Sequence, residues 1–381
     1  MKNINTFGIA TLMLISMLTI MVGSVISPSL IAINDNLNFQ FDSGLLITLP
    51  SLGVVLFSSI TGGLLKKLGS FKLLCLGLVP YAIFGFGGAF LHNSYLLIAD
   101  RLLLGAAAVA VQIAATAIIA ENFLGAHRMK IIAWQGMAIE GGGVLFLSLG
   151  GLLGEMHWSY PFYIYLIALI CLLLSFLLLP KHAPDMTEQT KDKPETTHTN
   201  EKYLVFSIFL GSLFAMIIFF VSFIHLPEYL PKTFQFSESK TGYVMAGISF
   251  IAVITASQMP KIARAISSGA TVAIGFLFFM IGYFIFGVGN TEAFIYAGAC
   301  MLGIGFGLSI PTLNHMMVEV SSFKSRGKNL GLYSIGVFGG QFLSTFLGFI
   351  FVETTTLFLA TGCIALVICL LLFILFRKYP L

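Results

Sequence analysis

Residues 97–120 read LIADRLLLGAAAVAVQIAATAIIA, and this stretch decides what kind of protein the chain is. From Leu102 to Ala120 it carries no charged side chain, and about 20 apolar residues are enough to cross a lipid bilayer as a helix. Arg101 stands at the beginning of this run, directly after Asp100. A guanidinium within a membrane span is energetically expensive, so an ionisable residue there is by default a functional candidate. The stretch therefore predicts a membrane helix and a functional site together.

The composition extends this prediction to the whole chain. Of the 381 residues, 57% are hydrophobic and only 9% are charged, and the mean hydropathy is +0.97, whereas about a quarter of the residues of a soluble domain are charged. Twelve apolar runs of spanning length follow one another. Because backbone groups in lipid must bond within their own segment, we predict an all-α membrane protein with twelve transmembrane helices. The first run is too long for a cleaved signal, and we expect it to be the first of these helices.

Basic residues are distributed unevenly between the two sets of loops. With the N-terminus in the cytoplasm, nearly all of the 20 Lys and Arg residues fall in cytoplasmic loops or termini; only Lys232 and Lys240 fall outside, and Arg101 lies within a helix. Cytoplasmic loops of membrane proteins carry such an excess. We therefore expect a multi-pass protein of the cell membrane with both termini cytoplasmic. The formal net charge of +4 reflects this topology, so nucleic acid is not expected as a partner.

One segment differs from the rest of the chain. Residues 181–202, KHAPDMTEQTKDKPETTHTNEK, are polar, charged and rich in Pro and Thr. Such a composition predicts a flexible cytoplasmic linker. It divides the chain into an N-terminal six-helix bundle over residues 1–180 and a C-terminal six-helix bundle over residues 203–381.

The two halves repeat each other without a gap over roughly a hundred residues. A constant separation of 198 residues joins Lys66 to Arg264, Leu104-Gly105 to Leu302-Gly303, Glu121 to Glu319, Arg128 to Arg326, Lys130 to Lys328 and Gly141-Gly142 to Gly339-Gly340. Because charged residues are scarce here, matches at Glu, Lys and Arg are hard to obtain by chance. The repeat predicts two pseudo-symmetric halves in parallel orientation.

Two motifs resemble those of the major facilitator superfamily. The segment GGLLKKLGSFK from Gly62 to Lys72 resembles the family loop G-x-L-a-D-r-x-G-r-[kr], although Lys66 stands where the family has Asp. Leu97, Arg101 and Gly105 match the family pattern l-x-x-x-R-x-x-q-G. The resemblance implies that Arg101 takes part in proton coupling. The alternative is that Arg101 extends to the outer interface or pairs locally with Asp100.

Within this family the chain is most similar to the twelve-helix drug:proton antiporters. Their fifth helix ends in G-P-x-x-G-G, and Gly150-Gly151 fit, but Phe146 and Leu147 occupy the Gly-Pro positions. The mirrored pairs Glu121/Arg128 and Glu319/Arg326, with the loop residues Lys66 and Lys67, resemble the family's cytoplasmic gates. Ordinary solvated loop charges are the alternative reading of these residues.

Several further ionisable residues are candidates for proton coupling or substrate binding. Glu140 lies about nine residues into the fifth helix, or ~14 Å deep, where a carboxyl is protonated, paired or facing water. Asp35 lies at the outer end of the first helix, and Asp35 and Glu140 are possible partners of Arg101. Asp100 and His225 complete the set, since a histidine titrates near physiological pH. Asp35 has simple exposure as its alternative, and His225 has a structural role.

These observations predict a secondary transporter that works by alternating access. Proton-coupled export of a small organic or amphipathic molecule, such as a drug or a metallophore-like metabolite, is the first hypothesis, and proton-coupled uptake of a small metabolite is the second. A membrane enzyme or a non-transporting sensor is the rival class. No P-loop, zinc motif or paired cysteine motif is present in the sequence, so we expect neither ATP-driven pumping nor enzymatic activity. We expect a monomer in the lipid bilayer with protons as coupling ion and with no cofactor or metal.

Overall fold

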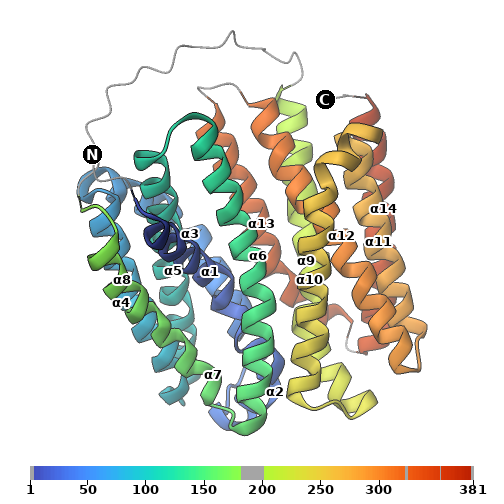
Figure 1. Cartoon of the computed structure of the whole chain (residues 1–381). Coiled ribbons are helices and arrows are strands. Elements are labelled where there is room, and N and C mark those ends of the chain that lie inside the picture. The colour runs from blue at the N-terminus through green and yellow to red at the C-terminus, as the bar shows by residue number, and fades with distance from the viewer. Residues whose placement is uncertain (1–3, 182–200, 322–324, 352, 379–381) are drawn as a thin grey trace. The chain divides into compact units, whose positions relative to one another are not determined.

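The computed structural model describes residues 4–181, 201–321, 325–351 and 353–378. The described helices form twelve candidate spans that are long and apolar enough to cross a membrane, and the predicted all-α class is confirmed. The linker predicted for residues 181–202 lies almost wholly outside the described residues. The helices divide into two compact units, Met1–Gln189 with Phe236–Ala246, and Thr190–Gln235 with Gly247–Leu381 (Figure 1).

The first unit contains the helices coloured from blue to green in Figure 1. They are α1 (Thr6–Ser24), η1 (Ser27–Ser29), α2 (Leu30–Leu37), α3 (Leu45–Leu68), α4 (Ser70–Gly87), η2 (Gly88–Phe90), α5 (Ser94–Asn122), α6 (Gly125–Met156), α7 (Tyr160–Tyr163), η3 (Ile164–Leu166) and α8 (Ile167–Leu178).

The helices of the second part of the chain are longer and less often interrupted. They are α9 (Glu201–Phe234), α10 (Glu238–Ile266), α11 (Ser268–Val288), α12 (Glu292–Val320), α13 (Arg326–Ile350) and α14 (Thr354–Lys378). The beginning of α10 belongs to the first compact unit, where Glu155 at the end of α6 accepts a hydrogen bond from the Ser239 backbone N–H (3.1 Å). A carboxylate suits this place, because the first N–H groups of a helix have no partner within the helix.

Local sequence explains why the first span is broken. Pro28 lies in the short helix η1 between α1 and α2. A proline cannot donate a backbone hydrogen bond, and it disturbs the helix that precedes it. The three pieces still form one candidate span, Thr6–Leu37. The last turn of α3 carries the exposed residues Lys66 and Lys67. We call this the basic end of the unit.

The sequence repeat reappears as equivalent contacts in the two units. In the first, a Cβ atom on Gly105 of α5 would lie 2.0 Å from the Pro50 carbonyl oxygen of α3. In the second, a Cβ atom on Gly303 of α12 would lie 2.6 Å from the Ile248 carbonyl oxygen of α10. Both residues of the pair are shifted by the same 198 positions. Glycine is needed at both places because two helix backbones touch there.

Tyrosine hydroxyls join the corresponding helix pairs of the two units, at positions that the repeat of 198 residues does not relate. Tyr81 of α4 donates to the Leu18 carbonyl of α1 (2.6 Å), and Tyr283 of α11 donates to the Ile218 carbonyl of α9. A buried hydroxyl without a partner is destabilising, so each bond fixes the distance between two spanning helices. The helix α5, which carries Arg101, packs against α1, α3 and α4. This position in the middle of the unit encloses its charged residues.

Candidate functional site

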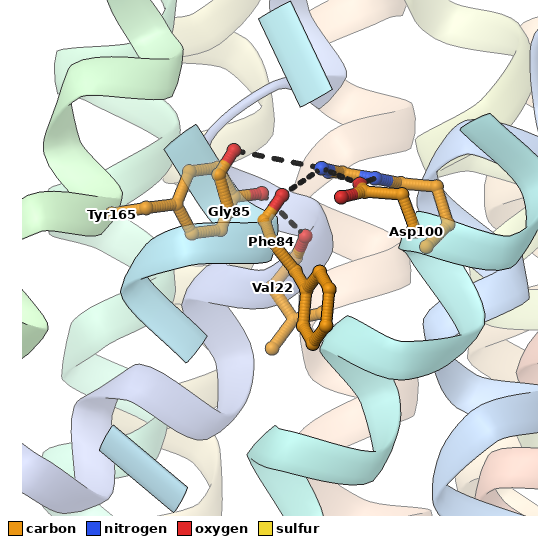
Figure 2. A network of polar contacts seen from close by, with 6 residues as sticks. Val22, Phe84, Gly85, Asp100 and Tyr165 are labelled. Carbon is orange, nitrogen blue, oxygen red and sulfur yellow. Dashed lines mark hydrogen bonds and ion pairs between the residues drawn. The ribbon is translucent and has the colours of Figure 1, made fainter. Parts of the chain in front are cut away.

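Arg101 lies on α5 and is the largest fully buried side chain of the described chain, with 1% of its surface exposed. Its Nε and Nη2 atoms donate to Asp100 Oδ2 at 3.0 and 2.6 Å (Figure 2). Asp100 is also buried. The local pairing left open by the sequence is therefore what the structure contains, and neither Asp35 nor Glu140 bonds to the guanidinium.

The same guanidinium also closes the end of α4. Nη2 donates to the carbonyl oxygens of Phe84 (2.6 Å) and Gly85 (3.5 Å), which belong to the last turn of that helix (Figure 2). Carbonyl groups of a final turn have no partner within the helix and carry partial negative charge. The Phe84 carbonyl also accepts from the backbone N–H of Gly88, so the cation adds a charge-assisted hydrogen bond to this end of the helix.

Aromatic rings and one glycine complete the surroundings of Arg101. The rings of Phe162 and Tyr165 have their centroids 5.7 and 5.9 Å from the guanidinium carbon, within the range of cation–π attraction. Tyr165 itself is held by a hydrogen bond from its hydroxyl to the Val22 carbonyl of α1 (2.7 Å). A Cβ atom on Gly88 would lie 2.2 Å from Arg101 Nη2. Gly88 thus leaves the space that the guanidinium occupies.

This arrangement can hold a proton-sensitive charge in the membrane. Asp100 can gain or lose a proton, whereas Arg101 remains charged in proteins. One nitrogen of the guanidinium, Nη1, is buried without a hydrogen-bond partner. A buried ion pair of this kind contributes little net stability, because desolvation opposes the attraction. Function is therefore a better reason than stability for placing these charges here.

Glu140 lies apart from this pair, on α6. Its side chain is half-buried, and none of the hydrogen bonds or ion pairs among the described residues includes it. It stands ten residues after Lys130, where the candidate span Lys130–Met156 begins, and therefore ~15 Å deep at ~1.5 Å per residue. This places it near the middle of a hydrocarbon layer of about 30 Å.

The other candidates for coupling have contrasting surroundings. Asp35 on α2 is exposed, as its alternative reading expected. His225 on α9 has its Nε2 atom buried without a partner and faces α13, where a Cβ atom on Gly348 would lie 2.8 Å from His225 Cε1. Among the described residues, no group of His, Cys, Asp and Glu side chains is arranged to hold a metal ion.

The proposed gate residues use partners other than each other. Glu121 accepts a hydrogen bond from the Ser70 hydroxyl at the beginning of α4 (2.5 Å), and Arg128 donates to the Phe123 carbonyl (2.6 Å). In the second unit Glu319 lies 3.6 Å from His315 Nδ1. The side chain of Arg326 lies outside the described residues. No ion pair between Glu121 and Arg128 occurs among the side chains that the structure describes.

A cluster of uncharged polar residues was missed by the sequence reasoning. Gln135 of α6 is 5% exposed, and its Nε2 atom donates to Ser16 Oγ of α1 and to Thr116 Oγ1 of α5, both at 3.1 Å. Counting only charged residues could not reveal it. A glutamine in an apolar run was the available signal, because a buried amide needs hydrogen-bond partners.

Comparison with known proteins identifies the family. The description Major Facilitator Superfamily matches residues 12–267 and 208–381. Quinolone resistance protein NorA of Staphylococcus aureus is 26% identical over 172 residues, 44% of each chain. A probable sphingolipid transporter, spinster homolog 1 of Arabidopsis thaliana, is 27% identical over 42% of this chain and 33% of its own length. The chain thus matches less than half the length of these curated relatives.

Solved structures show the same fold over nearly the whole chain. A peptide transporter in complex with sulfate has a TM-score of 0.79 at 12% identity, covering 98% of this chain and 96% of its own. A D-xylose–proton symporter has a TM-score of 0.74 at 17% identity, covering 96% and 97%. The family match spans the chain from residue 12 to residue 381. The chain belongs to the Major Facilitator Superfamily.

Proposed function

We propose that the protein exports a small amphipathic organic molecule in exchange for protons, by alternating access. The similarity to a quinolone resistance protein over 44% of the chain supports export and this class of substrate. The cell membrane is the proposed location, with both termini in the cytoplasm, because the basic end of the first unit then faces the cytoplasm. The protein is proposed to act as a monomer.

The observation that carries the proton coupling is Glu140. Its carboxyl has no bonded partner among the described residues and lies about midway through a membrane span. An ionised carboxylate without a partner is costly in such surroundings, so Glu140 binds a proton or pairs with a cationic substrate. One residue that alternates between these two states exchanges protons for substrate.

The other ionisable residues have supporting roles in this proposal. Asp100 is a second proton acceptor, and Arg101 holds it next to the last turn of α4. Asp35 and His225 are proposed to contact substrate or protons. Lys66, Lys67 and the Glu121/Arg128 and Glu319/Arg326 pairs are proposed to act at the cytoplasmic gate.

Transport by purified protein in proteoliposomes tests this function. A pH gradient is imposed, the membrane potential is clamped with potassium and valinomycin, and the movement of rhodamine 123 is followed together with luminal pH. We expect the dye and protons to move in opposite directions. Movement in the same direction would contradict export by antiport and support uptake.

Glu140→Gln is the decisive variant, because it keeps the shape of the side chain and removes its charge. We expect it to fold and to lose dye accumulation driven by the pH gradient. Glu155→Gln is the matched control, since it changes a carboxyl at the exposed end of the same helix and its amide oxygen can still accept from Ser239 N–H. Equal accumulation by Glu140→Gln and the wild type would exclude Glu140 as the proton carrier.

A further inference from the structure

The polar cluster of Gln135, Ser16 and Thr116 joins three helices of the first unit. Gln135 Nε2 lies 3.1 Å from each hydroxyl oxygen, so α6 is bonded to α1 and to α5 through one amide. The two hydroxyls already have acceptors for their protons. Ser16 donates to the Leu12 carbonyl (2.7 Å), and Thr116 donates to the Gln112 carbonyl (3.0 Å).

These bonds determine which way the Gln135 amide faces. Each hydroxyl gives its proton to its own helix, so each hydroxyl oxygen can only accept from Gln135. Both hydroxyl oxygens must therefore face the amide nitrogen of Gln135, which donates one of its two protons to each of them. The Gln135 carbonyl oxygen Oε1 lies 3.5 Å from Thr116 Oγ1. The Thr116 proton is instead donated to the closer Gln112 backbone carbonyl, at 3.0 Å. Gln135 thus retains an acceptor with no good donor.

A second amide lies beside the cluster. Gln112 stands one helical turn before Thr116 on α5, and side chains four residues apart share a helix face. Gln112 is half-buried and Thr116 is exposed, on a helix that packs against α1, α3 and α4. None of the side-chain hydrogen bonds described includes the Gln112 amide. Polar groups in a membrane span face other protein groups, water or a substrate path, and not lipid.

We propose that Gln135 and Gln112 form a subsite for a hydrogen-bond donor on the transported molecule. The group it fits is an N–H or O–H, which Gln135 Oε1 and the Gln112 amide oxygen can accept. This inference rests on the proposed transport of amphipathic molecules and deepens it. Glu140 lies five residues further along α6, ~7.5 Å in rise and about 140° around the helix axis, so the subsite is separate from the proposed proton carrier.

Two dyes that differ only in N–H groups test the subsite. Rhodamine 123 has primary amines, and tetramethylrhodamine methyl ester has the same rings, charge and ester with every amine hydrogen replaced by methyl. Binding of both to the purified full chain in detergent is measured by fluorescence polarisation. The readout is the ratio of their two dissociation constants, because the difference in apolar surface is the same for every variant.

We expect Gln135→Met and Gln112→Met each to shift this ratio about five-fold toward the methylated dye, the size of one hydrogen bond. Gln112→Met has no described side-chain bond to lose, so it keeps the test valid if Gln135→Met does not fold. Ser175→Ala is the control: its hydroxyl is buried in α8 and donates to the Cys171 carbonyl (2.7 Å). It should leave the ratio unchanged.

An unchanged ratio in folded Gln112→Met overturns the proposal, and so does failure of the wild type to bind either dye. The outcome is separate from that of the transport experiment. A ratio that depends on the two glutamines supports the subsite even if no proton-driven flux occurs. Proton-driven flux with an unchanged ratio supports export and removes the subsite.

Discussion

The place occupied by Arg101 in the first unit is occupied by a ring in the second. A shift of 198 residues takes Gly88 to Phe286, Asp100 to Gly298 and Arg101 to Ala299. In the second unit a Cβ atom on Gly298 would lie 2.5 Å from Phe286 Cε1, so the ring lies against the glycine. In the first unit the glycine is Gly88, at the end of α4, and the guanidinium of Arg101 on α5 occupies the space beside it.

This difference shows that the fold does not require charge at this place. Phe286 is fully buried and packs against Phe358 with ring centroids 5.5 Å apart. The apolar solution also satisfies the fold's need for close packing. Since replacing a buried ion pair by apolar groups is often neutral or stabilising, stability alone does not explain the charges of the first unit, and we propose that they serve the proposed transport. The following predictions test this comparison.

The largest effect is expected from Arg101→Ala. It leaves Asp100 buried without its partner and removes the donors to the last turn of α4, so we expect a loss of about 3–5 kcal/mol of unfolding free energy. Denaturant unfolding of the purified protein measures it. Ala299→Gly is the control at the equivalent place, and a loss below about 1 kcal/mol in Arg101→Ala would contradict the structural role of the ion pair.

A smaller effect is expected from alanine at the equivalent glycines Gly105 and Gly303. Each new Cβ atom would meet a helix carbonyl, at 2.0 and 2.6 Å respectively, so we expect losses of about 3 kcal/mol, greater at Gly105. Thermal unfolding in detergent compares the two. Gly136→Ala is the matched control because nothing lies within 4 Å of its Cβ position. If only one of the two were destabilising, the units would not be mechanically equivalent.

Transplanting the apolar arrangement sharpens the comparison. The triple variant Gly88→Phe, Asp100→Gly, Arg101→Ala gives the first unit the residues of the second at these positions. We expect its unfolding free energy to lie within about 2 kcal/mol of the wild type, because no unpaired charge remains, while proton-driven transport is reduced. A variant less stable than Arg101→Ala alone would show that the two places pack differently.

The smallest effect is expected from Gly88→Ala. The new Cβ atom would meet a flexible side chain and not a backbone, so the guanidinium can move at a cost of about 1 kcal/mol. Gly87→Ala is the control beside it, with nothing within 4 Å and an expected gain of up to about 1 kcal/mol in the helix. Equal effects of the two substitutions in thermal unfolding would argue against contact between Gly88 and Arg101.

Hydropathy and spacing predicted much of the fold and less of the site. The spans and the repeat were predictable, because both depend on residue types at fixed separations. The partner of Arg101 was left open among Asp100, Asp35 and Glu140. Neighbouring residues on a helix do not face each other, yet the long Arg101 side chain brings Nε within 3.0 Å of Asp100. The roles of Gly88 and Gln135 depend on which helices lie next to each other, and hydropathy and motif spacing do not reveal helix neighbours.

The reciprocal contact between α3 and α5 has a mechanical consequence. A Cβ atom on Gly53 would lie 2.2 Å from the Leu102 carbonyl oxygen, and one on Gly105 would lie 2.0 Å from the Pro50 carbonyl oxygen. Neither helix can therefore rotate or slide against the other without a collision of backbones. We therefore expect α3 and α5 to tilt together as one rigid body. Its basic end carries Lys66 and Lys67, and Arg101 lies next to the contact itself. A displacement of the loop after α3 therefore also displaces the buried charges, ~20 Å away at ~1.5 Å per residue.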